Sequence, residues 1–197
     1  HEDGGWGWWQ SDESHPFMTA YVVAGLSEAR GDGIAVKQEA IDKSVAWIKK
    51  DLDQDKNLAP DLRAYLGYAL AVAGRADTAT LDHSYGERVS LSPYGTAILG
   101  LAFETRKDAR AGELARHLVS TVHENGEEAS WPAERDEMLD FSADITPEAT
   151  AYALKLVSRE QPNSPLLPKA ALCLVNHRDQ GYWWNSTKQT AMVIYGL

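Results

Sequence analysis

Four carboxylates stand near the predicted starts of apolar helices, where two acids could act on one substrate. They are Asp12, Glu13, Asp144 and Glu148. Glycosidases use such a pair, because one carboxyl group protonates the leaving oxygen while the other acts as base or nucleophile. Tryptophans that could stack on sugar rings lie in neighbouring loops, at Trp8, Trp9, Trp183 and Trp184. The alternative is that the helix dipole favours these acids at helix N-termini and that the tryptophans pack within the loops.

Common motifs for metal, phosphate or thiol chemistry are missing. The chain has no His-Glu-x-x-His, no paired Cys-x-x-Cys and no Gly-rich phosphate loop, so we expect neither a metal nor a cofactor. His117 and His123 lie six residues apart in one predicted helix, a poor spacing for a shared ligand, and are interpreted as surface residues. The single cysteine, Cys173, lies in an apolar helix and is interpreted as a buried core thiol.

The composition is that of a globular protein with an acidic surface. Hydrophobic residues make up 44% and charged residues 24% of the 197 residues, and the net charge is −10. This balance argues against a nucleic-acid surface, which needs clustered Lys and Arg. No apolar run is long enough to span a membrane. The chain begins in a polar segment and its last helical pattern has no capping signal, so we expect one domain over 1–197, truncated at both ends.

An internal repeat organises the chain. Four apolar segments begin with Thr-Ala, and a fifth has Arg in place of Thr; the segments begin at Thr19, Arg63, Thr96, Thr150 and Thr190. Their spacing of 33 to 54 residues fits two helices and two loops. Each segment is apolar nearly all round, with Ala and Gly interspersed, which is typical of helices buried on most sides.

Amphipathic segments alternate with these apolar ones. We predict such helices over 35–52, 76–89, 108–124 and 164–177, and no β-strands. Five inner helices alternating with four outer helices indicate an all-α fold, an incomplete α/α toroid of helical hairpins. An open solenoid of helical pairs is the alternative, and the apolar character of the inner set favours closure.

Aromatic loops enter several of the inner helices. "GWGWW" precedes the first and "GYWW" the last, so we expect Trp6, Trp8, Trp9, Trp183 and Trp184 at one face of the toroid, either packed or exposed. We predict that Trp9→Ala or Trp184→Ala destabilises the fold by a few kcal/mol, as expected of packed rings. A loss below about 0.5 kcal/mol at both would mean that the rings are exposed for binding. The longest loop, over 125–149, is predicted to be mobile and to end where Thr146 caps a helix.

Three motifs together resemble the thioester domain of the α2-macroglobulin family, above all its bacterial members. They are "DGGWGWW…FMTAYVVAGL", "ITPEATAYALKLV" and "GYWWNSTKQTAMVIYGL", in the family's order over nearly the whole chain. Complement thioester domains are similar in the same places. The resemblance implies an α6/α6 toroid with a terpenoid-cyclase-like fold, of which nine of twelve helices are present.

The resemblance also implies a chemistry whose residues this chain lacks. In the family, a Cys-x-Glu-Gln motif forms an internal thioester, which proteolysis elsewhere in the protein exposes to nucleophiles of the attacking protease. Cys173 is followed by Leu-Val-Asn, so it does not belong to such a motif. The segment 51–62, where some relatives carry a His that assists transfer to hydroxyls, has none, which implies direct reaction with amines.

The expected function is therefore that of a scaffold. We expect part of a bacterial protease inhibitor, periplasmic, envelope-associated or secreted, whose partners are target proteases. We expect a monomer, no membrane span, and no catalysis by this chain. An α/α-toroid glycosidase or lyase is the alternative, and an acidic cleft with two free carboxylates would favour it. A third possibility is a helical repeat that binds a partner protein in an open groove.

Overall fold

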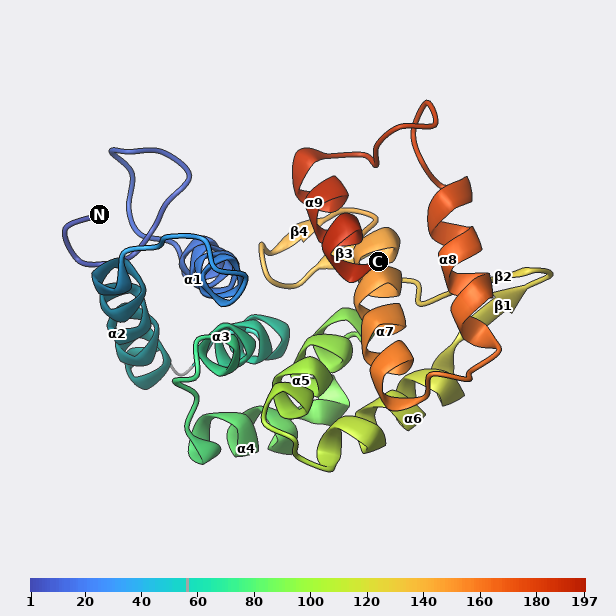
Figure 1. The fold of residues 1–197 in the computed structure, drawn as a ribbon, viewed down its shortest axis with the longest axis horizontal. Coiled ribbons are helices and arrows are strands. Elements are labelled where there is room, and N and C mark those ends of the chain that lie inside the picture. Colours follow the sequence, from blue (N-terminus) through green and yellow to red (C-terminus); the bar gives the residue numbers. More distant parts are fainter. Residues whose placement is uncertain (56) are drawn as a thin grey trace.

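The computed structural model describes residues 1–55 and 57–197, which form a curved array of helical hairpins (Figure 1). Inner helices are α1 (Pro16–Gly31), α3 (Pro60–Val72), α5 (Pro93–Thr105), α7 (Thr146–Glu160) and α9 (Thr187–Gly196). Outer helices are α2 (Gln38–Gln54), α4 (Thr78–Gly86), α6 (Arg110–Thr121) and α8 (Leu166–Asn176), with a short 3-10 helix at Arg88–Ser90. The predicted all-α class is confirmed, as is the alternation of inner and outer helices.

The inner helices pack on one another in chain order, α1 on α3, α3 on α5, α5 on α7 and α7 on α9. Nearly every residue of α3 and α5 is buried, as their all-round apolar sequences predict. Small residues permit this packing. A Cβ added to Gly100 of α5 would lie 2.2 Å from Cδ2 of Leu156 in α7, and one added to Gly196 would lie 2.5 Å from Cβ of Ala151.

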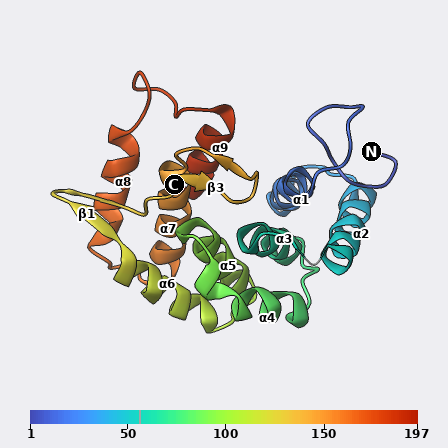
Figure 2. The ribbon, with the colours of Figure 1, turned by 180° about the vertical axis from the view of Figure 1, so that it is seen from behind.

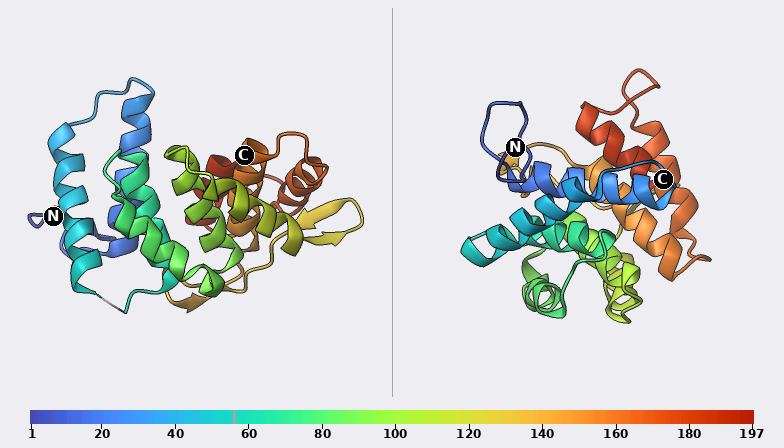
Figure 3. Two further views of the ribbon diagram at one scale, coloured as in Figure 1. Left: turned by 90° about the horizontal axis from the view of Figure 1, so that it is seen from below. Right: turned by 60° about the vertical axis from the view of Figure 1, so that its left-hand side comes forward.

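The outer helices cover this inner layer from outside (Figure 2). Helix α2 buries Ile41, Val45 and Ile48 in a single stripe, and α6 buries Leu114 and Leu118, while their opposite faces are polar. Seen from below, the segment before α1 lies at one end of the array, and a β-hairpin projects at the other (Figure 3).

Side chains fill the centre of the arc. Tyr65, Tyr94 and Tyr152 are almost completely buried there, with Tyr94 and Tyr152 edge to face at 5.2 Å between ring centroids. The two ends of the arc also touch, because the hydroxyl of Tyr195 in α9 hydrogen-bonds to Glu28 of α1 and to Tyr68 of α3. This arrangement agrees with the predicted incomplete toroid and not with an open solenoid.

The prediction that the chain has no strands is wrong. The segment between α6 and α7 contains two antiparallel hairpins, β1 (His123–Asn125) with β2 (Glu128–Ser130), and β3 (Arg135–Asp136) with β4 (Phe141–Ser142). Strands of two or three residues are too short to show an alternating pattern. The available signal was Gly126, which is the first residue of the two-residue turn and has a φ of 62°, as a tight hairpin turn requires.

Two boundaries near this segment also differ from prediction. Helix α6 ends at Thr121, so His123 belongs to a strand and not to the helix that carries His117. Thr146 does not cap α7, because it is already the first helical residue and Ile145 is the N-cap. Asp144 takes the capping role instead, since its Oδ1 accepts a hydrogen bond of 2.9 Å from the backbone N–H of Thr146. Within the described residues, no helix combines the length and hydrophobicity needed to cross a membrane.

Candidate functional site

The starts of the inner helices are held side by side by polar side chains. Ser92, the N-cap of α5, donates its backbone N–H to Oδ1 of Asp61 in the first turn of α3, at 3.0 Å. Gln189 in the first turn of α9 donates to Oε2 of Glu148 in the first turn of α7, at 2.7 Å. These helix starts therefore form one face of the molecule, from which the aromatic loops emerge.

The repeated threonine anchors a tryptophan in three of these loops. The backbone N–H groups of Trp6, Trp131 and Trp184 donate to the hydroxyls of Thr19, Thr150 and Thr190, at 2.9, 3.2 and 3.1 Å. Thr19 and Thr150 are buried and Thr190 is half-buried, and an amide left unpaired beside them would be costly. The Thr of the repeat is therefore the acceptor that fixes each loop onto its inner helix.

Each of the same tryptophans also reaches an outer helix through its indole N–H. Trp6 donates to Oγ of Ser44 in α2 at 2.9 Å, Trp131 to the carbonyl of Leu118 in α6 at 2.8 Å, and Trp184 to the carbonyl of Leu174 in α8 at 3.1 Å. Each ring thus connects one inner helix to the outer helix beside it. Trp131, in the long loop that precedes the Thr-Ala segment at Thr150, is not among the five predicted face aromatics.

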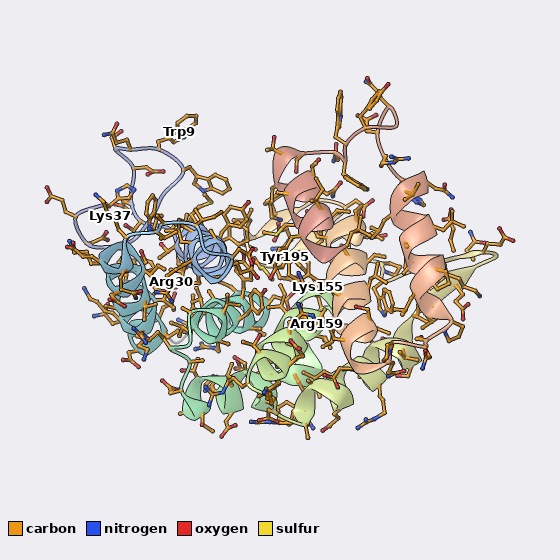
Figure 4. The ribbon with its side chains drawn as sticks, viewed as in Figure 1. Trp9, Arg30, Lys37, Lys155, Arg159 and Tyr195 are labelled. Carbon is orange, nitrogen blue, oxygen red and sulfur yellow. The ribbon has the colours of Figure 1, made fainter. Side chains whose placement is uncertain are left out.

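The five predicted face aromatics divide into packed and exposed residues. Trp184 is 6% exposed, whereas Trp6, Trp8 and Trp183 are 38%, 51% and 46% exposed and Trp9 is 77% exposed. Figure 4 shows Trp9 pointing outward from its loop. The expectation that Trp9 packs and supports the fold is therefore wrong, because its ring has little protein around it.

The exposed tryptophans form two groups and not one. Trp6, Trp8 and Trp9 line a hollow of about 800 Å³ beside the N-terminus, and the Trp8 ring lies edge on to His15 at 6.3 Å. Trp183 instead contacts Tyr182 in the loop between α8 and α9, at 6.1 Å between ring centroids. A backbone bridge between Asp179 and Trp183 shapes that second loop.

The predicted carboxylates mostly bind backbone or neighbouring side chains. Oδ2 of Asp12 accepts from the N–H groups of Trp8 and Trp9 at 2.8 and 3.0 Å, and Asp144 caps α7. Glu148 is buried and Glu13 is exposed. These contacts are those expected of structural acids at helix starts.

A buried charged cluster joins the long segment between α6 and α7 to α9. Nζ of Lys188 lies 2.5 Å from Oδ2 of Asp136 and 3.6 Å from Oε1 of Glu148, and both acids are buried. Burial raises the pKa of Glu148, and the Lys188 charge and the Gln189 hydrogen bond oppose that rise. No sequence pattern indicates that Asp136 and Lys188 pair, because the two residues are 52 positions apart.

A second polar group lies where the arc closes. Nζ of Lys155 donates to the backbone carbonyl of Tyr195 at 2.7 Å and stands 3.2 Å from the centre of its ring. Lys155, Arg159 and Tyr195 all lie toward the centre of the arc (Figure 4). Burial lowers the pKa of Lys155 to about 8. A cavity of about 110 Å³ adjoins this group, lined mainly by tyrosines and by Glu28.

The sequence has relatives among curated proteins. It is 28% identical over 131 residues to an alpha-2-macroglobulin of Xylella fastidiosa, which covers 60% of this chain and 8% of that protein. It is 38% identical over 50 residues to an alpha-2-macroglobulin of Thermotoga maritima, which covers 25% of this chain and 3% of that protein. A scan against models of protein families finds no match.

Solved structures with a similar fold are also alpha-2-macroglobulins. The chain superposes on a Salmonella alpha-2-macroglobulin that had reacted with methylamine, with a TM-score of 0.74 and 21% identity over 99% of this chain. It also superposes on a native Escherichia coli alpha-2-macroglobulin spanning domain MG7 to the C-terminus, with a TM-score of 0.73 and 20% identity over all of this chain. The chain is similar in sequence and in fold to bacterial alpha-2-macroglobulins.

This chain matches only a small part of each of these proteins. It spans 8% or less of the length of the curated relatives described above, and 13% and 31% of the Salmonella and Escherichia coli chains. The sequence relatives and the superposed structures confirm the fold and the family resemblance that the three motifs predict.

Proposed function

We propose that residues 1–197 are most of the helical, thioester-type domain of a bacterial alpha-2-macroglobulin that traps proteases. The observation that carries this proposal is the likeness of fold over 99% of the chain to an alpha-2-macroglobulin that reacts with methylamine. The sequence relatives support it independently.

The domain's part in this function is to be a rigid scaffold. The Trp–Thr pairs fix the loops at the inner-helix starts. Buried tyrosine side chains fill the centre of the arc. Since the chain has no Cys-x-Glu-Gln motif, a thioester in the whole protein would be supplied by residues outside 1–197. The chain itself then performs no turnover, and a thioester carried on this scaffold reacts directly with amines.

The whole protein is proposed to inhibit endopeptidases as a monomer in the periplasm, at the cell envelope or outside the cell. Its partners are the proteases that cleave it. Support comes from structural neighbours that include Escherichia coli alpha-2-macroglobulin activated by trypsin and by porcine elastase.

Co-elution with a protease tests this proposal. The whole protein is mixed with trypsin and separated by size exclusion, and we expect peptidase activity to elute with the large protein. Treatment with methylamine beforehand distinguishes the mode of capture, since uptake of one methylamine with release of one thiol indicates a thioester. Free elution of all trypsin, with or without methylamine, would contradict the proposed trap.

An α/α-toroid glycosidase or lyase remains the alternative that the same sample can test. It needs two free carboxylates in a cleft, but Asp12 and Asp144 bind backbone N–H groups and Glu148 pairs with Lys188. Release of reducing sugars from a panel of polysaccharides would favour the enzyme over the trap.

A further inference from the structure

Three side chains of types that bind metal ions converge where the β1–β2 hairpin packs on α8. Cys173 and His177 lie four residues apart on one face at the end of α8, and Glu128 is the first residue of β2. The Cys173 Sγ lies 3.6 Å from Nδ1 of His177, which lies 3.9 Å from Oε2 of Glu128. One ligand atom from each residue can be chosen so that all three lie within 4.8 Å of one another.

These separations fit the edges of a tetrahedral zinc site. With Zn–S near 2.3 Å, Zn–N near 2.1 Å and tetrahedral angles, the sulfur and nitrogen should be about 3.6 Å apart. The observed distance between Sγ of Cys173 and Nδ1 of His177 is 3.6 Å. A nitrogen and an oxygen ligand should be about 3.4 Å apart. The Glu128 carboxylate therefore needs to move about 0.5 Å toward His177. One of its oxygens lies within 4.8 Å of Sγ of Cys173 and must also approach it to about 3.6 Å.

We propose that Cys173, His177 and Glu128 bind one Zn²⁺ ion, with the fourth coordination position open to solvent. A thiolate, an imidazole and a carboxylate are all ordinary zinc ligands, and three protein ligands with one open position is a common arrangement. A cavity of about 190 Å³ adjoins the cluster and has room for the fourth ligand. His123 and Asp144 also line this cavity and carry groups that can take the place of the solvent ligand.

The surroundings hold two of the ligands in place before the metal arrives. Nδ2 of Asn176 donates to the other oxygen of Glu128 at 2.6 Å, which leaves Oε2 directed at His177. Cys173 is buried and belongs to a well-packed turn of α8. The two elements that carry the ligands are joined by backbone packing, since α8 contacts β2 directly.

Metal binding requires two proton movements. Nδ1 of His177 lies 2.8 Å from the carbonyl of Cys173, so in the metal-free protein it carries the proton and donates it there. Because Nδ1 faces this carbonyl, coordination at Nδ1 requires the imidazole ring to turn away from it, and the ring proton moves to Nε2 on the solvent side. The Cys173 thiol releases its own proton to solvent and binds as the thiolate.

Cobalt(II) substitution tests the site directly, because a thiolate ligand gives an intense charge-transfer band and tetrahedral Co²⁺ gives strong visible bands. The purified protein carrying this chain is kept reduced and titrated with Co²⁺, and the bound ion is then displaced with Zn²⁺. We expect one equivalent of Co²⁺ with both sets of bands, and their loss when Zn²⁺ is added. The Cys173→Ser variant in the same protein should lose the charge-transfer band.

Cys173→Ser changes a buried residue and could impair folding, so two variants of less buried ligands are measured beside it. Glu128→Gln keeps an oxygen for Asn176, and His177→Gln changes an exposed side chain. Each should weaken Zn²⁺ binding about tenfold or more, whereas His117→Gln on the exposed face of α6 should leave it unchanged. Cobalt spectra without a thiolate band, or equal Zn²⁺ affinity in wild type and Cys173→Ser, would overturn the proposal.

Discussion

The backbone N–H of Trp184 donates a hydrogen bond of 3.1 Å to the hydroxyl of Thr190, which is the first residue of the last Thr-Ala segment. The same relationship ties Trp6 to Thr19 and Trp131 to Thr150. The repeat in the sequence thus corresponds to a repeated set of contacts, which we call the Trp–Thr joint. In each joint one tryptophan connects a loop, an inner helix and an outer helix.

Trp184→Ala should cost about 3–5 kcal/mol of unfolding free energy, because it removes a buried ring and its hydrogen bond to Leu174. Trp9→Ala is the matched control, since that ring is 77% exposed and its loss should cost less than about 0.5 kcal/mol. Urea unfolding followed by circular dichroism measures both. Equal losses in the two variants would contradict the division into packed and exposed tryptophans.

Thr150→Val should cost about 1–3 kcal/mol, because valine keeps the shape of threonine but leaves the N–H of Trp131 without its acceptor. Thr190→Val should behave in the same way through Trp184. Thr105→Val is the control, since that hydroxyl bonds only the carbonyl of Leu101 within its own helix and the residue is exposed. Equal losses of unfolding free energy in all three variants would contradict a stabilising role of the Trp–Thr hydrogen bond.

The helices could be predicted from sequence because each carries its signal locally. The all-round apolar pattern of residues 63–70 and 96–103 identified buried inner helices, and the stripe of Ile41, Val45 and Ile48 identified an outer one. Such patterns reflect burial, and burial is what the toroid imposes on each layer.

The site contacts could not be predicted in this way, because they join residues far apart in the chain. Lys188 meets Asp136 across 52 positions, and Asn176 meets Glu128 across 48. The exposure of Trp9 was also hidden, since "GWGWW" has the same composition whether its rings pack or not. The anchored tryptophans lie 13, 19 and 6 residues before their threonines, so their spacing does not distinguish them from the other tryptophans.

Lys188→Met should cost about 3 kcal/mol or more near neutral pH, because it leaves Asp136 and Glu148 buried without their cation. The unfolding free energy that Lys188→Met loses should be smaller at pH 5. Burial raises the folded-state pKa of Glu148, and removing Lys188 raises it further. A carboxyl group of this kind favours the folded state while protonated, and that contribution disappears as pH rises through its folded pKa.

Unfolding free energies of wild type and Lys188→Met at pH 5 and pH 8 check the sign of this effect. Lys43→Met is the control, because its ion pair with Glu39 is exposed and should contribute less than about 0.5 kcal/mol. A Lys188→Met loss that grows as the pH is lowered would contradict the account.

Lys155 should react with acetic anhydride at a lower pH than other lysines, since burial lowers its pKa to about 8. Lys43 is the internal control, because its hydrogen bond to Glu39 raises its pKa above the usual value for lysine. Peptide mapping by mass spectrometry gives both acetylation profiles in one sample. Arg159→Gln should shift the Lys155 profile to higher pH, since it removes a nearby positive charge. Identical profiles for the two lysines would show that the amine of Lys155 is not desolvated.

The dependence of inhibition on substrate size tests the central claim most directly. The whole protein is incubated with trypsin, and hydrolysis of a short peptide and of a large protein substrate is measured in the same sample. A trap encloses the protease without blocking its active site, so peptide hydrolysis should persist while hydrolysis of the large protein is strongly reduced. Equal hydrolysis of both substrates, with and without the protein, would contradict the assignment of this chain to a protease trap.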